Sequence, residues 1–318
     1  MRRFLITGVN GFIGRAVSSA LVARGKIVTG LARHSGGAVN GVRERVLEGE
    51  DFTGLDTLSN PLGPCDCVIH LAARVHLMRD TAADPVAAYR ATNVDGTLRV
   101  AHAARQAGAH RFVFVSSVKA AAEADNGTPL RELDAAMPSD PYGVSKLQAE
   151  RALTTFGRTT GMEIVIVRPP LVYGPGVRAN FLHLMAAIAR GIPLPLSLIG
   201  ARRSMVFVDN LADALIRCAL HPYAAGETFY VSDGFDLTVA ELARTLSRHL
   251  NVPARLIPVP VPMLRLAGRL IGCSTTVGRL VSDLRLDTSH IGEVLGWRAP
   301  YSVEEGLLKT VIWYRSTH

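Results

Sequence analysis

The chain has 318 residues, of which 48% are hydrophobic and 19% are charged, as expected of a folded globular protein. Its formal net charge is +8, but the basic residues are scattered and aromatic residues make up only 6%. This pattern argues against a nucleic-acid-binding surface and favours a site for a phosphate-bearing small molecule. No apolar run is long enough to cross a bilayer, so membrane insertion is not expected.

The N-terminal half alternates between strand-like and helix-like segments. Short apolar runs predict strands at 4–6, 27–29, 67–71, 111–115 and 163–167. Apolar residues at helical spacing predict helices over 11–24, 85–106 and 141–156. Strands that alternate with helices form βαβ units, so we expect an α/β fold with a doubly wound parallel sheet.

Prolines become frequent after residue 168, and we expect the later segments to form a smaller, mostly helical lobe. A strand and a helix over 205–220 are expected to return to the sheet. One domain would therefore comprise 1–168 and about 205–235, and the lobe would comprise 169–204 and about 236–318. The segment 259–272 combines apolar residues with two arginines, which predicts a buried or interfacial amphipathic helix.

The four cysteines lack the spacing of a metal site or of a disulfide framework. We expect reduced thiols and no bound metal. The apolar run at the start of the sequence is too short for a signal peptide. Both observations favour a cytoplasmic protein.

A glycine-rich turn follows the first predicted strand. Gly8, Gly11 and Gly14 stand where that strand gives way to a helix. Glycines let the backbone approach a pyrophosphate closely, and the helix N-terminus supplies free N–H groups. We therefore expect a dinucleotide site that includes Phe12 and Ile13 of the same turn.

The end of the second strand bears on the choice of dinucleotide. An acidic residue there binds the ribose of NAD, whereas an arginine binds the extra phosphate of NADP. Ala32 stands at the expected position of the acid, and Arg33 follows it. The sequence favours NADP over NAD, and both remain open.

A tyrosine and a lysine lie four residues apart at the start of the third predicted helix. Tyr142 and Lys146 therefore share one helix face. A nearby ammonium favours the phenolate, which makes such a tyrosine a candidate acid/base. Ser116 and Ser117 follow the strand at 111–115 and so lie at its carboxyl end, where open α/β sheets bind ligands.

These motifs together resemble the extended short-chain dehydrogenase/reductases that act on nucleotide sugars, a family with a Rossmann domain. The resemblance covers essentially the whole chain. Its marks are TGVNGFIG at 7–14, DF at 51–52, HLAA at 70–73, NVDGT at 93–97, FVSS at 114–117, YGVSK at 142–146, RPPLVYGPG at 168–176 and RRSMVFVDNLADA at 202–214.

The resemblance implies roles for individual residues around the cofactor. Tyr142 would be the acid/base, Lys146 would bind the nicotinamide ribose and lower the tyrosine pKa, and Ser117 would hold the reacting oxygen. The other residues implied at the cofactor are Asp51 and Phe52 at the adenine, Leu71, Ala72 and Ala73 along the groove, Asn93, Ser116, and Pro169 to Leu171 beside the nicotinamide.

The resemblance also implies a substrate site in the second lobe. Asn180 and Arg203 would bind the diphosphate, and either Arg279 or Arg285 would be a second arginine there, with Arg279 preferred. Many relatives have VYG after the catalytic serine, whereas this chain has Val118, Lys119 and two alanines. Lys119, with Arg74 and His76, is a candidate contact to the sugar.

The SSVK sequence at 116–119 is similar to a bacterial subgroup of surface-polysaccharide pathways. That subgroup contains 4-epimerases and 4-keto reductases, which use the same Ser/Tyr/Lys site. We expect a nucleotide-sugar 4-epimerase, with an NADPH-dependent 4-keto-6-deoxy sugar reductase as the alternative. The helices over 85–106 and 141–156 are expected to form a homodimer contact, as in relatives.

Overall fold

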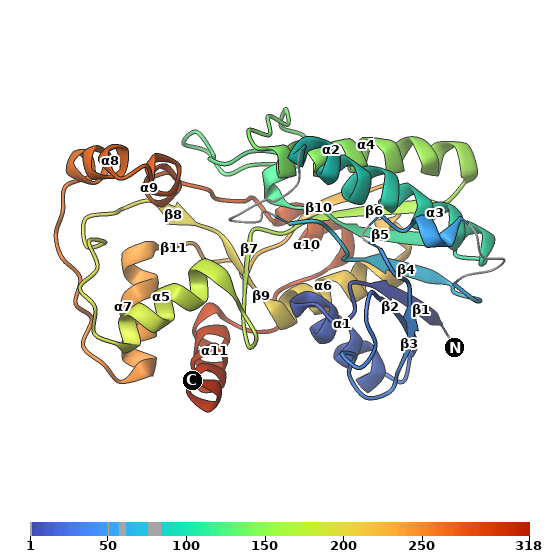
Figure 1. The fold of residues 1–318 in the computed structure, drawn as a ribbon, viewed down its shortest axis with the longest axis horizontal. Coiled ribbons are helices and arrows are strands. Elements are labelled where there is room, and N and C mark those ends of the chain that lie inside the picture. Colours follow the sequence, from blue (N-terminus) through green and yellow to red (C-terminus); the bar gives the residue numbers. More distant parts are fainter. Residues whose placement is uncertain (1, 50, 57–61, 76–83) are drawn as a thin grey trace.

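The computed structural model describes residues 2–49, 51–56, 62–75 and 84–318 (Figure 1). Its centre is a seven-stranded sheet in the order β10-β6-β5-β4-β1-β2-β3, and every pairing is parallel. The strands are β1 (Arg3–Thr7), β2 (Ile27–Ala32), β3 (Val42–Val46), β4 (Cys67–His70), β5 (Arg111–Val115), β6 (Glu163–Arg168) and β10 (Thr228–Tyr230). This arrangement confirms the predicted doubly wound fold.

The chain reverses its direction of travel across the sheet between β1 and β4. The first three strands run outward on one side, and β4, β5 and β6 run outward on the other. Thr7 and His70, at the carboxyl ends of β1 and β4, are register partners. Ligands of open α/β sheets bind beyond the carboxyl ends at such a switch point.

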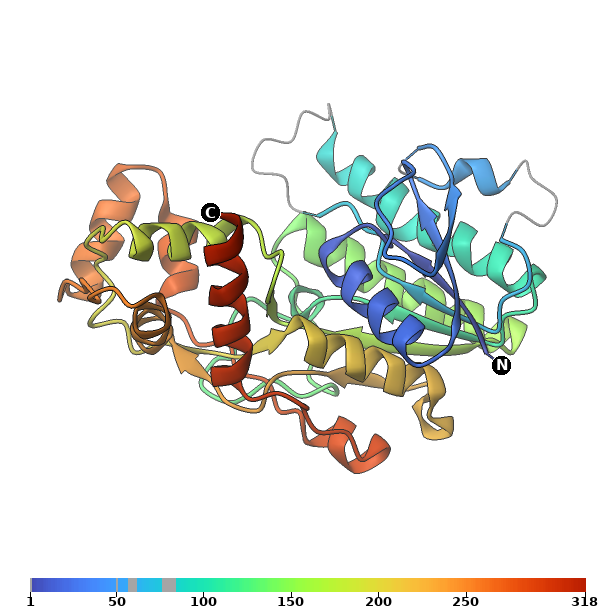
Figure 2. The same ribbon diagram turned by 90° about the horizontal axis from the view of Figure 1, so that it is seen from below.

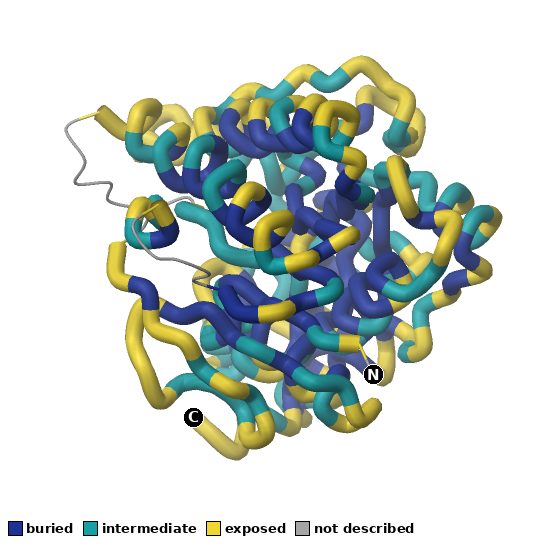
Figure 3. Tube along the Cα trace, turned by 90° about the vertical axis from the view of Figure 1, so that its right-hand side faces the viewer, coloured by how far each residue is buried: buried dark blue, intermediate teal, exposed yellow. Residues whose placement is uncertain are grey.

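The central strands are buried on both faces, which explains their continuous apolar character. One face packs against α1 (Phe12–Ala23) and α6 (Val208–Leu220), which lie side by side in Figure 2. The other face packs against α3 (Gly96–Gln106) and α4 (Pro141–Thr160). Figure 3 shows the buried residues gathered in these layers.

The helix predicted over 85–106 is one continuous rod with a wider turn inside it. It comprises α2 (Pro85–Arg90), the π-helical segment η2 (Ala91–Asp95) and α3. The helix predicted to end at 156 continues as α4 to Thr160, where Gly161 adopts a left-handed conformation with φ of 74°. A glycine in that conformation is a frequent helix stop.

A second, mostly helical lobe lies beside the sheet (Figure 1). Its helices are α5 (Ala179–Ala189), α7 (Val239–Leu250), α8 (Val261–Leu270), α9 (Ser274–Leu280) and α11 (Val303–Thr317). Two small sheets accompany them, β7 (Leu171–Tyr173) with β9 (Met205–Phe207), and β8 (Arg202–Arg203) with β11 (Leu237–Thr238). The short turns are η1 (Thr53–Leu55), η3 (Val118–Ala120) and η4 (Pro222–Ala224).

The segment 205–220 only partly returns to the large sheet. Helix α6 packs on the sheet as expected, but β9 pairs with β7 outside it, so the expectation for this strand was wrong. The seventh strand of the large sheet is β10, and α10 (Ser289–Leu295) lies beside it with the His290 ring 5.3 Å from the Phe229 ring. The division into two domains at the stated residues stays a prediction.

Candidate functional site

The glycine turn after β1 closely approaches the start of the loop after β4. Gly8 has φ of 65°, and a Cβ atom on it would lie 3.0 Å from the Ala72 nitrogen. A Cβ atom on Gly14 would lie 2.2 Å from the Gly8 oxygen. Only glycine fits both positions. The tight turn brings the backbone to the floor of a pocket at the switch point.

This pocket has a volume of about 460 Å³. The N-terminus of α1 has neither a side-chain cap nor an acidic residue in its first turn. The first N–H groups of this helix are therefore available to an anion such as a pyrophosphate. The predicted cofactor residues that line the pocket are Gly8, Gly11, Arg33, Phe52, Leu71, Ala72 and Ala73.

The adenosine end of the pocket matches the sequence expectation in part. Ala32 and Arg33 line it at the end of β2, whereas the Asp51 carboxylate is turned into the η1 segment. There it accepts hydrogen bonds from the Thr53 N–H at 3.3 Å and the Thr53 hydroxyl at 3.0 Å. Glu44, the acidic residue of β3, accepts hydrogen bonds from the N–H groups of residues 36–38.

A hydrogen-bonded chain holds the two central strands together below the pocket. The Thr7 hydroxyl lies 2.9 Å from Nδ1 of His70 and accepts bonds from the Leu71 and Ala72 N–H groups, each at 3.1 Å. The Thr97 hydroxyl lies 3.1 Å from Nε2 of the same histidine. Burial and the nearby Lys146 lower the pKa of His70 to about 3, so this imidazole is neutral.

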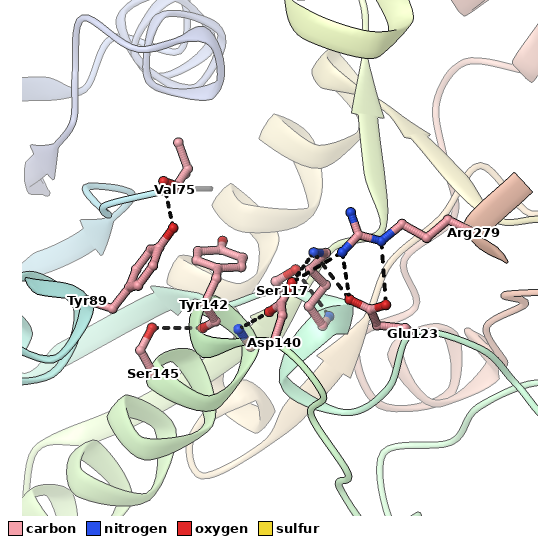
Figure 4. Close-up of polar contacts among 10 residues, drawn as sticks. Val75, Tyr89, Ser117, Glu123, Asp140, Tyr142, Ser145 and Arg279 are labelled. Carbon is pink, nitrogen blue, oxygen red and sulfur yellow. Dashed lines mark hydrogen bonds and ion pairs between the residues drawn. The ribbon is translucent and has the colours of Figure 1, made fainter. Parts of the chain in front are cut away.

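Tyr142 stands in the first turn of α4, where its ring is partly buried beside Tyr89 (Figure 4). The Asp140 side chain caps this helix by accepting the Gly143 N–H at 2.7 Å, and Pro141 takes the first helical position. Burial raises the pKa of Tyr142 to about 12, the nearby Ser117 hydroxyl opposes the rise, and Asp140 adds to it. The phenol therefore lies near the Ser117 hydroxyl.

Lys146 lies one helical turn further along α4 and is completely buried. Its Nζ atom donates to the Val115 carbonyl at 2.7 Å and lies 4.0 Å from the centre of the Phe114 ring. Burial lowers the pKa of Lys146 to about 7, against a rise caused by Glu150. The lysine is thus fixed at the carboxyl end of β5, below Ser116 and Ser117.

Asn93 connects three parts of the site. Its amide nitrogen donates to the Ser145 hydroxyl at 2.9 Å and to the Arg74 carbonyl at 3.0 Å, and its oxygen accepts the Arg74 N–H at 2.8 Å. The Ser145 hydroxyl in turn donates to the Tyr142 carbonyl at 2.7 Å (Figure 4). Asn93 therefore supports both the loop beside the pocket and the first turn of α4.

Ser116 and the segment after β6 lie beside this group. The hydroxyl of Ser116 is buried and has no hydrogen-bond partner among the described residues, which leaves it available to a ligand. The Pro169 carbonyl accepts the Val118 N–H at 2.9 Å, which ties the two segments together. Leu171 follows in β7 with 48% of its surface exposed.

An ion-pair network lies on the other side of Ser117 and connects the two lobes (Figure 4). Lys119 pairs with Asp140 and lies 3.5 Å from the Glu123 carboxylate. Arg279, from α9, pairs with Glu123 at 3.0 Å and with Asp140 at 3.6 Å. Burial alone would raise the pKa of Asp140, but bonds from Lys119 and the Gly143 N–H hold it below its ordinary value.

The predicted diphosphate residues occupy different environments. Arg203 is partly buried and donates from Nη1 to the carbonyls of Arg279 at 2.6 Å and Ser282 at 3.2 Å. Asn180 is exposed in the first turn of α5. Arg285 binds the buried Asp125 carboxylate at 2.8 Å, whereas Arg279 reaches Glu123 and Asp140, next to the candidate acid/base Tyr142. His76 lies outside the described residues.

Residues 4–232 match the model of the NAD dependent epimerase/dehydratase family. The chain belongs to this family. It is 40% identical to a UDP-glucose 4-epimerase of Vibrio cholerae over 97% of this chain and 94% of that protein. The resemblance stated from the sequence is thereby confirmed.

Solved structures of family relatives are also similar over the whole chain. A UDP-glucose 4-epimerase from Thermotoga maritima, in complex with UDP-glucose, is 25% identical with a TM-score of 0.80, covering 99% of each chain. MoeE5, in complex with UDP-glucuronic acid and NAD, is 25% identical with a TM-score of 0.78, covering 99% of this chain and 100% of that one. The pocket of this epimerase/dehydratase chain, with its uncapped helix N-terminus and glycine floor, fits the NAD dependence of the family.

Sequence reasoning missed two carboxylates of this epimerase/dehydratase site. Asp140 directly precedes the helix-starting Pro141, a local signature of a helix cap that was available from the sequence. Glu123 carries no such signature, because its partner Arg279 lies 156 residues further along the chain. Among the described residues no cluster of His, Cys, Asp and Glu could hold a metal ion, and no helix is long and apolar enough to span a bilayer.

Proposed function

We propose that the protein is a nucleotide-sugar 4-epimerase that acts on a UDP- or dTDP-linked hexose or deoxyhexose. The observation that carries the proposal is that Tyr142, in the first turn of α4, and Ser117 lie near each other beyond the carboxyl end of β5, where the buried Lys146 binds the Val115 carbonyl. This group lies on the sheet edge that also forms the dinucleotide pocket. The likeness to UDP-glucose 4-epimerases supports the choice of chemistry.

In this reaction Tyr142 removes the proton of the sugar C4 hydroxyl and later returns it. Ser117 donates a hydrogen bond to the C4 oxygen and so holds the 4-keto sugar in place. When bound, NAD supplies the hydride acceptor for C4, later the hydride donor, and a positive charge that favours the phenolate. Lys146 lies one helical turn from the tyrosine, and in its protonated form its ammonium charge would favour the phenolate.

The keto sugar must present both of its faces to the same hydride position for the configuration at C4 to invert. Arg203, Arg279 and Asn180 support this step by binding the diphosphate, which does not react. Holding the substrate at that distant group leaves the sugar ring able to turn. The cations of Arg279 and Lys119 already lie at the edge of the catalytic group.

A second candidate is an NADPH-dependent reductase of 4-keto-6-deoxy nucleotide sugars, with Tyr142 as the proton donor. The observation that favours it is the adenosine end of the pocket, where Ala32 and Arg33 stand and no carboxylate lines the wall among the described residues. Arg33 would bind the 2′-phosphate of NADP. An epimerase with Arg33 at this position would hold either NADP or NAD as its bound cofactor.

Two further expectations belong to this proposal. The rod of α2, η2 and α3 and the helix α4 would form a four-helix contact in a homodimer. The four cysteines are free thiols, and three of them are buried, which supports a reducing, cytoplasmic setting.

The decisive experiment is to denature the purified protein and identify the dinucleotide that is released. The epimerase retains its cofactor through each turnover, so oxidised dinucleotide in near-stoichiometric amount supports the proposal. A panel of UDP- and dTDP-sugars is then assayed for conversion to the C4 epimer without added cofactor. An empty site, with turnover only of 4-keto sugars and added NADPH, would replace the epimerase by the reductase.

A further inference from the structure

Helix α8 lies at the tip of the second lobe (Figure 1), and several of its apolar residues are exposed. Met263 is 61% exposed, Leu266 59%, Leu270 79% and the following Ile271 73%. Soluble helices ordinarily bury such residues and expose polar ones. Helix α8 instead exposes its apolar residues, and an exposed apolar face of this kind indicates an interaction surface.

The spacing of these residues gives the helix two adjacent outer stripes. Met263, Leu266 and Leu270 follow one another at helical spacing and form the apolar stripe. Arg265 and Arg269, four residues apart, form a basic stripe along its border. The inner side packs on α9, where a Cβ atom on Gly268 would lie 2.7 Å from Val277.

The segment before α8 also exposes apolar residues. Ile257 is 44% exposed and Leu198 51% exposed, and their loops meet where the Ser197 N–H donates to the Ile257 carbonyl at 3.4 Å. Pro258, Pro260 and Pro262 restrict the backbone that leads into α8. The apolar side chains are thus presented by a stiff segment.

The charge of this region is of one sign. Between Glu241 and Asp283 the sequence contains six arginines and no acidic residue. Arg248 pairs with Glu304, and Arg279 pairs with Glu123. Of the others, Arg244 interacts electrostatically with Glu241 of α7. The Arg255 guanidinium lies beside Gly191, after α5. The two arginines of α8, Arg265 and Arg269, are exposed and have no carboxylate partner among the described residues.

We propose that this surface docks on the headgroup region of an anionic lipid bilayer, with α8 lying in the plane of the membrane. The α8 surface comprises Met263, Leu266, Leu270 and Ile271, with Arg265 and Arg269 along their border. Apolar side chains would enter the boundary between headgroups and acyl chains, and the arginines would bind phosphates. Such docking needs no membrane-spanning helix.

The charge pattern distinguishes a lipid surface from a second copy of the chain. In a twofold dimer through this face, each arginine stripe would meet the same acid-free surface. The arginines would then lose water without gaining a carboxylate, which is costly. An anionic bilayer supplies phosphates at every position along the stripe.

The test is co-sedimentation of the full-length protein with vesicles of phosphatidylcholine alone or mixed in equal parts with phosphatidylglycerol. We expect binding to the anionic vesicles that weakens with added salt and is lower on phosphatidylcholine. The doubles Leu266→Ser with Leu270→Ser, and Arg265→Gln with Arg269→Gln, should each lower the partition coefficient roughly tenfold or more. Turnover of a water-soluble substrate should stay unchanged.

Matched doubles on other surfaces control for general loss of apolar area or charge. Leu308→Ser with Ile312→Ser changes two exposed apolar residues of α11, and Arg151→Gln with Arg158→Gln changes two exposed arginines of α4. Both controls should bind vesicles like the wild type. Absent binding, equal binding to both vesicle types, or a dimer that the leucine variants dissociate would each overturn the proposal.

Discussion

Asp140 and Lys119 form an ion pair between the first turn of α4, which carries Tyr142, and the loop that carries Ser117. The same carboxylate caps α4 through Gly143 and contacts Arg279 of the second lobe. Asp140 thus connects the candidate acid/base, the candidate oxygen-binding hydroxyl and the substrate lobe.

Replacing Asp140 should separate its two roles. Asparagine is an equally good helix cap but lacks the charge, so Asp140→Asn should lower kcat roughly tenfold to a hundredfold through misplacement while the melting temperature changes little. Asp140→Ala should also lose about 1 kcal/mol of stability. Steady-state kinetics and thermal unfolding measure the two effects. An unchanged kcat in Asp140→Asn would remove the positioning role.

The two substrate-lobe arginines should differ in their effects. Arg279→Ala should raise the apparent KM for the nucleotide sugar roughly tenfold or more without loss of stability, because its side chain is partly exposed. Arg203→Ala should raise KM and also lower the melting temperature, because Arg203 holds two carbonyls at the end of α9. Arg285→Ala, whose partner is Asp125, is the control for KM. Equal KM values in all three variants would contradict the assignment.

Arg33 is the candidate residue for discrimination between NADP and NAD. If it binds a 2′-phosphate, Arg33→Ala should weaken NADP(H) binding roughly tenfold or more and leave NAD(H) binding nearly unchanged. Titration of the cofactor-free protein with each dinucleotide measures both constants. Arg24→Ala is the control for the loss of a positive charge. Arg24 lies at the C-terminal end of α1, and its guanidinium pairs with Asp213 of α6. An equal loss of affinity for NADP(H) and NAD(H) would show that Arg33 does not bind the 2′-phosphate.

The buried His70 should make folding stability depend on pH. Its folded pKa of about 3 lies below the unfolded value of 6.5, so the unfolded chain binds the proton more readily. The stability is fully present above pH 6.5 and falls by about 1.4 kcal/mol per pH unit as the pH decreases toward 3. Urea unfolding of wild type and His70→Gln at several pH values tests this. The variant should be less stable at neutral pH but show a shallower slope, and identical slopes would exclude His70 as the cause.

The sequence predicted the buried strands better than the edges of the sheet. The run RFVFV at 111–115 is apolar and β-branched or aromatic throughout, and β5 has those bounds. Strand β3, VRERV, was missed because three of its residues are charged, and it lies at the solvent-exposed edge. Strand β10 was missed because three residues carry too little pattern to distinguish a strand from a loop.

The site was predictable where its residues follow local patterns. Tyr142 and Lys146 share a helix face, and Ser117 ends a strand, so their common edge followed from topology. The network of Lys119, Glu123 and Arg279 was not predictable, because it joins chain segments that only the tertiary fold brings together. The orientation of the Asp51 carboxylate toward Thr53 was not predictable either, because it depends on the backbone conformation of the intervening residue.

The most direct test of the catalytic assignment compares two neighbouring tyrosines. The rings of Tyr142 and Tyr89 are 6.3 Å apart, and the Tyr89 hydroxyl donates to the Val75 carbonyl at 3.3 Å. Turnover of the C4 epimerisation is measured in Tyr142→Phe and Tyr89→Phe, together with the dinucleotide bound to each. We predict that Tyr142→Phe lowers kcat roughly a thousandfold with its cofactor retained, while Tyr89→Phe stays within a few-fold of wild type. Near-normal turnover in Tyr142→Phe, or an equal loss in both variants, would contradict the account.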